Sequence, residues 1–332
     1  MISVIVPAYN AAQTLPACLA ALCRQTQPPD EIIVVDDGSQ DQTAQLARAH
    51  GAQVLEQPHL GPAAARNLGL RQAGGDIVLF TDSDCEPEAA WVAEMVRPFV
   101  DPQVVGVKGS YRTRQQEPVA RLVQCEFEER FDRLERLETI DFIDTYAAAF
   151  RVAALRETGG FDSAFPRADS EDAELSYRLA RAGCRLIFNR QAVVYHQHPN
   201  TWSAYMWRKI RFSYWRMVVY RLHPGKAVRD SYTPQVLKVQ LVLMYLVLGF
   251  TGLAFVFHPL LWAAVAALLG LAFSAIPFVR RAMRQDKTLT ITALVFIFAR
   301  TLAFAVGVTG GIVGMFFFHP ALQRKHDNIH TK

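Results

Sequence analysis

Cysteine is scarce in this chain and shows no pairing pattern. The five cysteines have no C-x-x-C spacing and no histidines at zinc-finger intervals. An odd, scattered set of this kind argues against a disulfide scaffold or a zinc finger, and we expect reduced residues that pack in the interior. The first residues also lack the basic region and the long apolar run of a signal peptide, so we expect the N-terminal part to stay in the cytoplasm.

Acidic residues are nearly absent after residue 200. Residues 200–332 contain sixteen Lys or Arg and three Asp or Glu, whereas residues 1–100 contain five and twelve. The overall net charge of +4 therefore hides an acidic front and a strongly basic rear. Because 51% of the residues are hydrophobic and only 20% are charged, a disordered chain is excluded. The asymmetry predicts a molecule of two parts, the second of which contacts a membrane or a polyanion.

No G-x-G-x-x-G motif follows the first apolar run, which argues against a dinucleotide oxidoreductase. Instead, short apolar runs alternate with helical patterns. Since parallel neighbours in a sheet need a helical crossover, this rhythm predicts an α/β domain with a mostly parallel sheet and helices on both faces. The expected strands are Ser3–Val6, Glu31–Val35, Gln53–Glu56 and Asp76–Phe80, and the expected helices are Ala11–Arg24, Asp41–His50 and Ala63–Ala73.

Polar clusters follow the expected strands at their carboxyl ends, where such sheets bind ligands. Asp36–Ser39 follows the second strand, and Thr81–Asp84 follows the fourth. In an extended segment Asp82 and Asp84 point to the same side, which suits a hard divalent cation that holds a diphosphate. A D-x-D triplet alone is a weak signal, since a solvated turn has the same pattern. A turn is also the alternative for Asp36, which lies just before a Gly-Ser pair.

The middle of the chain is less regular. We expect helices over Val119–Leu137 and Ser170–Ala182, the second of which ends at Gly183. A strand over Leu186–Tyr195 follows, and the first domain is expected to finish near Pro199.

Aromatic and basic residues alternate in the segment 201–235. Because aromatic rings and long basic side chains suit the lipid headgroup layer, we interpret this segment as an interfacial helix. An ordinary surface helix is the alternative, and nucleic-acid binding is disfavoured because apolar runs follow at once. The residues of this pattern are Trp202, Tyr205, Trp207, Arg208, Lys209, Arg211, Phe212, Tyr214, Trp215, Arg216, Tyr220 and Arg221.

Two uncharged runs follow, each long enough to cross about 30 Å of hydrocarbon. They are Val239–Phe257, with nineteen residues, and Leu260–Val279, with twenty. The loop 280–287 is basic, which predicts a cytoplasmic position by the positive-inside rule. The next run, Thr288–Phe318, is long for one span and short for two, so the number of crossings stays open.

Arg300 is the one charged residue inside this last run. A charge at membrane depth is costly, so we expect Arg300 to face a protein interior, a water-filled groove or a lipid phosphate. The spacing of Gly307 with Gly311, and of Gly310 with Gly314, predicts close helix packing.

Six segments in the first 200 residues resemble, in order and spacing, the successive motifs of family 2 glycosyltransferases. They are Ser3–Asn10, Asp36–Ser39, Gly61–Gly69, Asp82–Asp84, Gly159–Asp162 and Ser170–Arg178. The resemblance implies the GT-A fold, a nucleotide-sugar donor, a divalent cation (Mg²⁺ or Mn²⁺) and an inverting transfer. The apolar C-terminal part is similar to that of membrane-attached bacterial members of the family.

The resemblance also implies roles for single residues at the donor site. Asp84 would bind the metal directly, Asp82 would face the ribose and the metal shell, and His196 would reach the metal or the diphosphate. A structural role is the alternative for His196. The donor would further lie against Pro7, Ala8 and Tyr9 at its nucleoside, Asp37 at its base or ribose, and Arg66.

Asp172 is the general base in the family pattern, and Glu171 or Glu174 would help to orient the acceptor or the base. A helix N-terminus keeps a carboxylate ionised, as a base that takes a proton from a hydroxyl must be. Compensation of the helix dipole is the alternative for these acids. Arg178, on the same helix, is a candidate partner for them.

We therefore expect a GT-A catalytic domain over 1–200, an amphipathic interfacial segment over 201–235, and a membrane domain over 236–332 with two to four apolar helices. The expected enzyme lies at the inner, cytoplasmic membrane with its catalytic domain facing the cytoplasm. Its acceptor would be a saccharide or a lipid-linked molecule such as a polyprenyl phosphate. It would contact membrane lipids and no nucleic acid.

Two alternatives stay open. One is a processive polysaccharide synthase, although the chain has only Trp207–Phe212 where processive members carry Q-x-x-R-W. The other is a catalytically silent membrane scaffold that keeps the fold. The intact Asp82, Asp84 and Asp172 argue against the scaffold.

Overall fold

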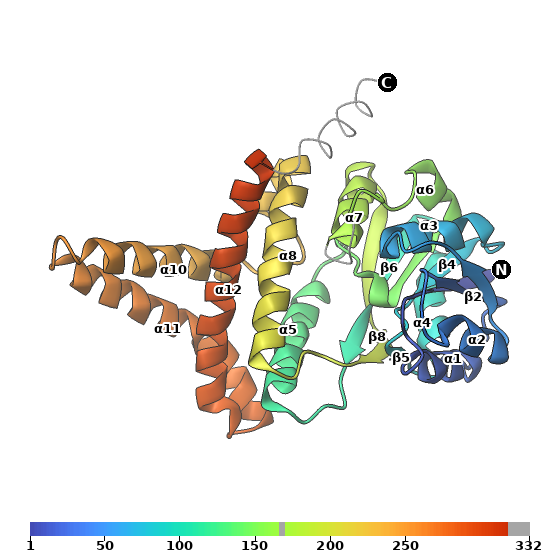
Figure 1. Cartoon of the computed structure of the whole chain (residues 1–332), viewed down its shortest axis with the longest axis horizontal. Coiled ribbons are helices and arrows are strands. Elements are labelled where there is room, and N and C mark those ends of the chain that lie inside the picture. The colour runs from blue at the N-terminus through green and yellow to red at the C-terminus, as the bar shows by residue number, and fades with distance from the viewer. Residues whose placement is uncertain (166–169, 318–332) are drawn as a thin grey trace. The chain divides into compact units, whose positions relative to one another are not determined.

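The computed structural model describes residues 1–165 and 170–317 (Figure 1). The described residues form two compact units. The first unit consists of 1–114 and 131–197, and the second consists of 115–130 and the described residues from 198 onward. The last part of the predicted membrane domain, 318–332, lies outside the described residues.

One mixed sheet forms the centre of the first unit. Its strands are β1 (Ile2–Ala8), β2 (Glu31–Asp36), β3 (Gln53–Glu56), β4 (Ile77–Phe80), β5 (Cys85–Pro87), β6 (Val104–Arg112), β7 (Ala148–Arg151) and β8 (Arg185–His196). They lie in the order β3-β2-β1-β4-β7-β6-β8-β5. The pairs β3-β2, β2-β1, β1-β4 and β6-β8 are parallel, and the other three pairs are antiparallel. The predicted α/β class and the five predicted strands are confirmed.

Short helices complete this unit and bury the apolar side chains of the strands. They are α1 (Leu15–Cys23), α2 (Thr43–Ala49), α3 (Pro62–Gln72), α4 (Trp91–Val96), α6 (Val152–Glu157) and α7 (Glu171–Arg181). Val4, Ile5 and Val6 on β1 are fully buried, as expected for a strand covered on both faces. α3 lies close to β1 because it carries Gly69: a Cβ at this position would be 2.6 Å from Cγ2 of Ile5.

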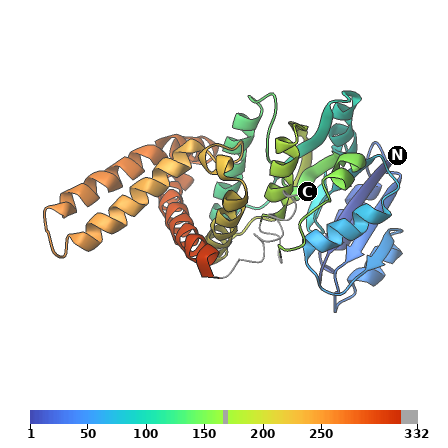
Figure 2. The same ribbon diagram turned by 90° about the horizontal axis from the view of Figure 1, so that it is seen from above.

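The second unit is helical. It contains the first part of α5 (Pro118–Leu134), then α8 (Trp202–Leu222), α9 (Pro224–Val228), α10 (Gln235–Leu253), α11 (Leu260–Gln285) and α12 (Leu289–Phe317). α8 and α12 lie side by side, whereas α10 and α11 form a hairpin that points away from them (Figures 1 and 2). The segment after residue 288 forms one continuous helix as far as it is described, although its length fits neither one span nor two.

Three helices of this unit are long and apolar enough to cross a membrane: α10, α11 and the segment 289–315 of α12. They differ in how much the protein covers them. In the most apolar stretch of each helix, 56% of α12 is buried inside the protein, compared with 17% of α10 and 22% of α11. Large exposed side chains such as Val256, Trp262 and Phe273 lie on the hairpin. The hairpin of α10 and α11 therefore exposes more apolar surface than α12 does.

Small residues let α8 and α12 approach each other closely. A Cβ at Gly311 would lie 2.6 Å from the carbonyl oxygen of Tyr214 and 2.9 Å from Cβ of Met217. A Cβ at Gly307 would lie closer still to the carbonyl oxygen of Ile210. The predicted close packing at these glycines is confirmed.

Arg300 faces the protein interior, one of the three environments predicted for it. Its side chain is 4% exposed, and its Nη2 donates to Oε1 of Gln240 over 2.7 Å. Its Nη1 lies 3.9 Å from Oε1 of Glu126, which also accepts from Nζ of Lys209 over 2.8 Å. The cost of burying the guanidinium is thus offset by a carboxylate and an amide.

Candidate active site

The D-x-D segment lies where β4 ends and β5 begins. β5 pairs with β8 in antiparallel register, so that Cys85 lies opposite His196. This pairing brings Nε2 of His196 to 3.2 Å from Oδ2 of Asp84. The ring of Tyr111 lies 5.0 Å from the His196 ring, between centroids. The structure thus brings together two predicted metal ligands that lie far apart in the sequence.

The donor atoms at this point fit a divalent cation. One ligand atom each from Asp84, Cys85 and His196 lies within 4.8 Å of the others. Burial, together with the charges of Asp82 and Asp84, raises the pKa of the Cys85 thiol well above its usual value. Carboxylate oxygens suit the hard cations Mg²⁺ and Mn²⁺, whereas sulfur ligands suit softer metals, so the chemistry of this set favours the Asp84 carboxylate as the metal ligand.

Arg66 connects the D-x-D segment to the N-terminus of α7. Its side chain is 2% exposed and lies on α3. Nη2 donates to Oδ1 of Asp82 over 3.0 Å, and Nη1 donates to Oε1 of Glu171 over 2.6 Å. The guanidinium also lies over the ring of Phe161. Three predicted site residues from three separate motifs therefore form one ionic cluster, in which Arg66 and Glu171 are buried and Asp82 is partly exposed.

The two acids at the start of α7 have different surroundings. The side chain of Glu171 is 2% exposed, and burial raises its pKa to about 7 although Arg66 lowers it. Asp172 is half-buried, and its Oδ1 accepts from the backbone N–H of Ala173 over 2.7 Å. Glu171 is thus held in place by Arg66 in the interior, whereas Asp172 is only partly buried.

Glu174 serves the structure of this region. Both of its carboxylate oxygens accept from Arg178, the shorter contact being 2.7 Å. Arg178 also donates to the carbonyl oxygens of Thr158 and Gly160. The predicted pairing of Arg178 with an acid of its own helix is confirmed, and Glu174 is its partner.

Asp37 organises the loop that follows β3. Its Oδ1 accepts from Nε2 of Gln57 over 2.6 Å and from the N–H of Leu60 over 2.9 Å. Its Oδ2 accepts from the N–H of Gly61 over 2.9 Å. Asp36 has the turn role that was its alternative, because its Oδ1 accepts from the N–H of Ser39 over 3.0 Å. A contact of Asp37 with a base or ribose stays a prediction.

Tyr9 follows β1 directly and stacks on His59, which no sequence motif predicted as part of the site. The rings of Tyr9 and His59 lie 4.0 Å apart between centroids, at 26°. Tyr9 is 45% exposed, so one aromatic surface is open to solvent next to the loop held by Asp37. Ala8 is buried and Pro7 is half-buried at the end of the strand. No spacing in the sequence connects His59 with Tyr9, because only the fold brings them together.

Family models match both parts of the chain. One described as "Glycosyl transferase family 2" matches residues 3–159, and one described as "Glycosyl transferase family group 2" matches residues 139–307. The second match covers more than half of the chain. The chain belongs to glycosyl transferase family 2. The expected family is thereby confirmed.

Curated relatives of this family are similar over about 60% of the chain. A pre-mycofactocin glycosyltransferase of Mycobacterium tuberculosis is 32% identical over 218 residues, which are 63% of this chain and 45% of the relative. A chondroitin synthase of Escherichia coli is 29% identical over 238 residues, 60% of this chain and 35% of the relative. The chain thus spans less than half the length of either.

One solved structure has a similar fold over nearly the whole chain. It is a mannosyltransferase from Pyrobaculum calidifontis in complex with GDP-Man and Mn²⁺. The identity is 22% and the TM-score 0.59, over 95% of this chain and 87% of that one. This likeness concerns the fold, and it confirms the predicted GT-A fold followed by apolar helices.

Proposed function

We propose that this protein is a metal-dependent, inverting glycosyltransferase that moves a sugar from a nucleotide-diphosphate donor to an acceptor hydroxyl or phosphate. The observation that best supports the proposal is that Arg66 binds Asp82 and Glu171 at once. Arg66 thereby joins the D-x-D segment to the start of α7, where Asp172 lies. A donor held at the D-x-D segment and an acceptor deprotonated by Asp172 would then meet at one site.

In this proposal Asp172 is the catalytic base. It is half-buried at the first turn of α7, where the helix dipole favours the ionised form of its carboxylate. It takes the proton of the acceptor hydroxyl while that oxygen attacks the anomeric carbon in line. Glu171 is a positioning residue, because its carboxylate is engaged with Arg66.

The donor would lie between the end of β1 and the D-x-D segment. Pro7, Ala8 and Tyr9 would hold the nucleoside, and Asp37 would contact the base or the ribose. Asp84, with Asp82 and His196, would hold Mg²⁺ or Mn²⁺, and the bound cation would neutralise charge on the departing diphosphate. The Mn²⁺ recorded for the similar mannosyltransferase structure supports a divalent cation here.

The acceptor and the location follow from the second unit. The apolar helices support attachment to a membrane, and the basic loop 280–287 supports the inner membrane with the catalytic domain on the cytoplasmic side. We therefore propose that residues 201–235 lie at the membrane surface and that the acceptor is lipid-linked or a saccharide of the cell envelope.

A processive polysaccharide synthase is the second candidate. The similarity to chondroitin synthase and to a hyaluronan synthase of Pasteurella multocida, 29% identical over 238 residues, favours it. Product length decides between the two candidates, because a single addition adds one sugar to each acceptor.

The decisive experiment measures nucleoside diphosphate release by the purified full chain from a panel of nucleotide sugars with Mg²⁺ or Mn²⁺, with and without membrane lipid extract. We expect release with one donor, stimulated by lipid. Asp172→Asn should abolish transfer and keep donor binding, whereas Asp76→Asn, at an exposed acid outside the site, should keep both. Turnover by Asp172→Asn would reject the base assignment. No release with any donor would favour the silent scaffold.

A further inference from the structure

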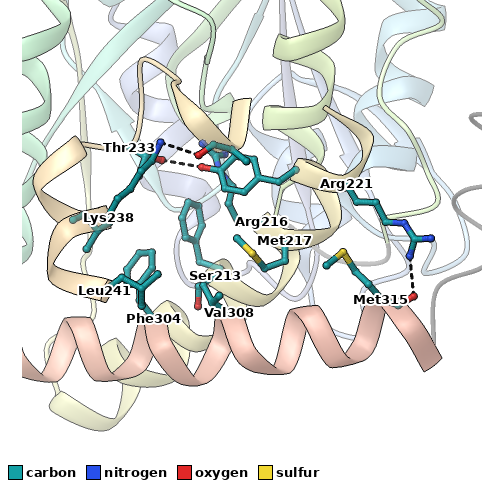
Figure 3. Close-up of a pocket in the computed structure, with 14 residues that line it drawn as sticks. Ser213, Arg216, Met217, Arg221, Thr233, Lys238, Leu241, Phe304, Val308 and Met315 are labelled. Atoms are coloured by element: carbon teal, nitrogen blue, oxygen red, sulfur yellow. Dashed lines mark hydrogen bonds between the residues drawn. The ribbon is translucent and has the colours of Figure 1, made fainter. Parts of the chain in front are cut away.

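A cavity of about 560 Å³ lies inside the second unit, between α8, α10 and α12 (Figure 3). Cavities of about 300–1,000 Å³ are typical of sites for small molecules. The wall is mostly apolar and includes Phe212, Met217, Leu241, Phe304, Val308 and Met315. Most of the cavity wall would therefore suit an apolar ligand.

The charged side chains that line this cavity are all basic: Arg216, Arg221 and Lys238. Arg216 has a counter-charge behind the wall, since its Nη2 lies 3.4 Å from Oδ2 of Asp230. Tyr220 donates to the same oxygen over 2.8 Å. After this pair is counted, Lys238 still leaves a positive charge on the lining. A ligand for the cavity is thus expected to have an anionic group as well as an apolar one.

Lys238 is the residue of this set that most needs an anion. It lies half-buried in the first turns of the apolar helix α10. Its Nζ donates to the carbonyl oxygens of Ala227 and Val228, over 3.0 and 2.6 Å, and within the described ranges it pairs with no carboxylate. An ammonium has three donors, and a charge held by neutral acceptors gains from an anionic one.

We propose that this cavity binds a lipid, with an alkyl chain along the apolar wall and a phosphate against Lys238. Two of the three helices around the cavity, α10 and α12, are apolar enough to cross a membrane, so a chain could enter from the bilayer. The inference rests on the proposed membrane attachment and is independent of the sugar transfer. Both membrane phospholipids and polyprenyl phosphates combine a long hydrocarbon chain with a phosphate, through a glycerol in the first and directly in the second.

Native mass spectrometry of the full chain in detergent micelles tests the proposal. The probes are phosphatidylglycerol, undecaprenyl phosphate and undecaprenol, which lacks the phosphate. At least one phosphate lipid should bind, and undecaprenol should bind about tenfold more weakly. Lys238→Ala should weaken the phosphate lipid about tenfold and leave undecaprenol unchanged, because it removes one charge-assisted hydrogen bond. Val308→Trp should weaken all three probes by filling the cavity.

Two control variants match these changes. Arg284→Ala removes an exposed base that does not line the cavity, and Val306→Trp adds the same ring to α12 at a position that is 51% exposed. Neither should alter lipid binding. Preference for undecaprenyl phosphate would identify a polyprenyl phosphate as the occupant, and preference for phosphatidylglycerol would identify a membrane phospholipid.

Two results would overturn the proposal. One is phosphate-lipid binding that Lys238→Ala leaves unchanged, and the other is binding of no phosphate lipid by the folded wild-type chain. Lipid binding needs no nucleotide sugar, so either result leaves nucleoside diphosphate release as a separate test of the glycosyltransferase proposal.

Discussion

Nη1 of Arg66 lies 2.6 Å from Oε1 of Glu171, and both side chains are 2% exposed. The two residues are separated by 105 positions in the sequence. Because a buried ion pair holds its partners in one geometry, this contact fixes the start of α7 relative to α3 and, through the second hydrogen bond of Arg66, relative to Asp82.

Arg66→Lys should lower kcat/KM about 100-fold, because an ammonium cannot reproduce the planar fork that binds Asp82 and Glu171 at once, and a misplacement of about 1 Å has this cost. Steady-state kinetics with the donor from the panel measures the change. Arg71→Lys is the control, since Arg71 lies exposed on the same helix. Equal losses in the two variants would reject the positioning role of Arg66.

His196→Ala should raise the half-saturating concentration of Mn²⁺ about tenfold or more, because it removes the imidazole beside Asp84. Titration of the metal-stripped enzyme with Mn²⁺ measures this. His50→Ala, which removes an exposed histidine of the same unit, should leave the titration unchanged. An unchanged titration of His196→Ala would show that His196 has the structural role instead.

The stability of the second unit should depend on pH through Glu126. Burial alone would raise the pKa of this acid, but Lys209, Arg300 and Arg130 lower it to about 2, below the ordinary value of 4.5. Its contribution to folding is therefore fully present above about pH 4.5 and is lost as the pH falls toward 2.

Glu126→Gln should lower the thermal unfolding temperature at pH 7 and flatten its decline between pH 5 and pH 3. Removing one partner of a buried pair costs about 3–5 kcal/mol. Thermal unfolding in detergent at a series of pH values measures both effects. Glu129→Gln is the control on the same helix. A decline as steep as in the wild type would assign the acid sensitivity to other groups.

Gly311→Ala should destabilise the packing of α8 against α12 by about 1–3 kcal/mol, because the added methyl group would meet Tyr214 and Met217. Gly252→Ala, where nothing lies within 4 Å, should instead stabilise α10 by up to about 1 kcal/mol. Thermal unfolding of both variants shows whether each substitution lowers or raises the unfolding temperature. Equal shifts would argue against close packing at Gly311.

Much of the first unit could be predicted from local patterns. Its first four strands are apolar runs bounded by turn residues, and their helices have clear periodicity, so the order of elements was evident. The antiparallel insertion of β7 and the pairing of β5 with β8 were not predicted, because such pairings join residues far apart in the chain. Likewise, one continuous helix at 289–317 could not be told from two short ones by length alone.

The sequence by itself determined the chemistry available: the carboxylates at strand ends, the acids at the start of α7, and an apolar, basic second part. These features depend on residue type and local periodicity, which the sequence contains directly. Only the tertiary structure decided which groups meet. It placed His196 beside Asp84, engaged the buried Glu171 with Arg66, and surrounded Arg300 with Glu126 and Gln240. Such contacts arise from strand register and helix packing, which no spacing along the chain specifies.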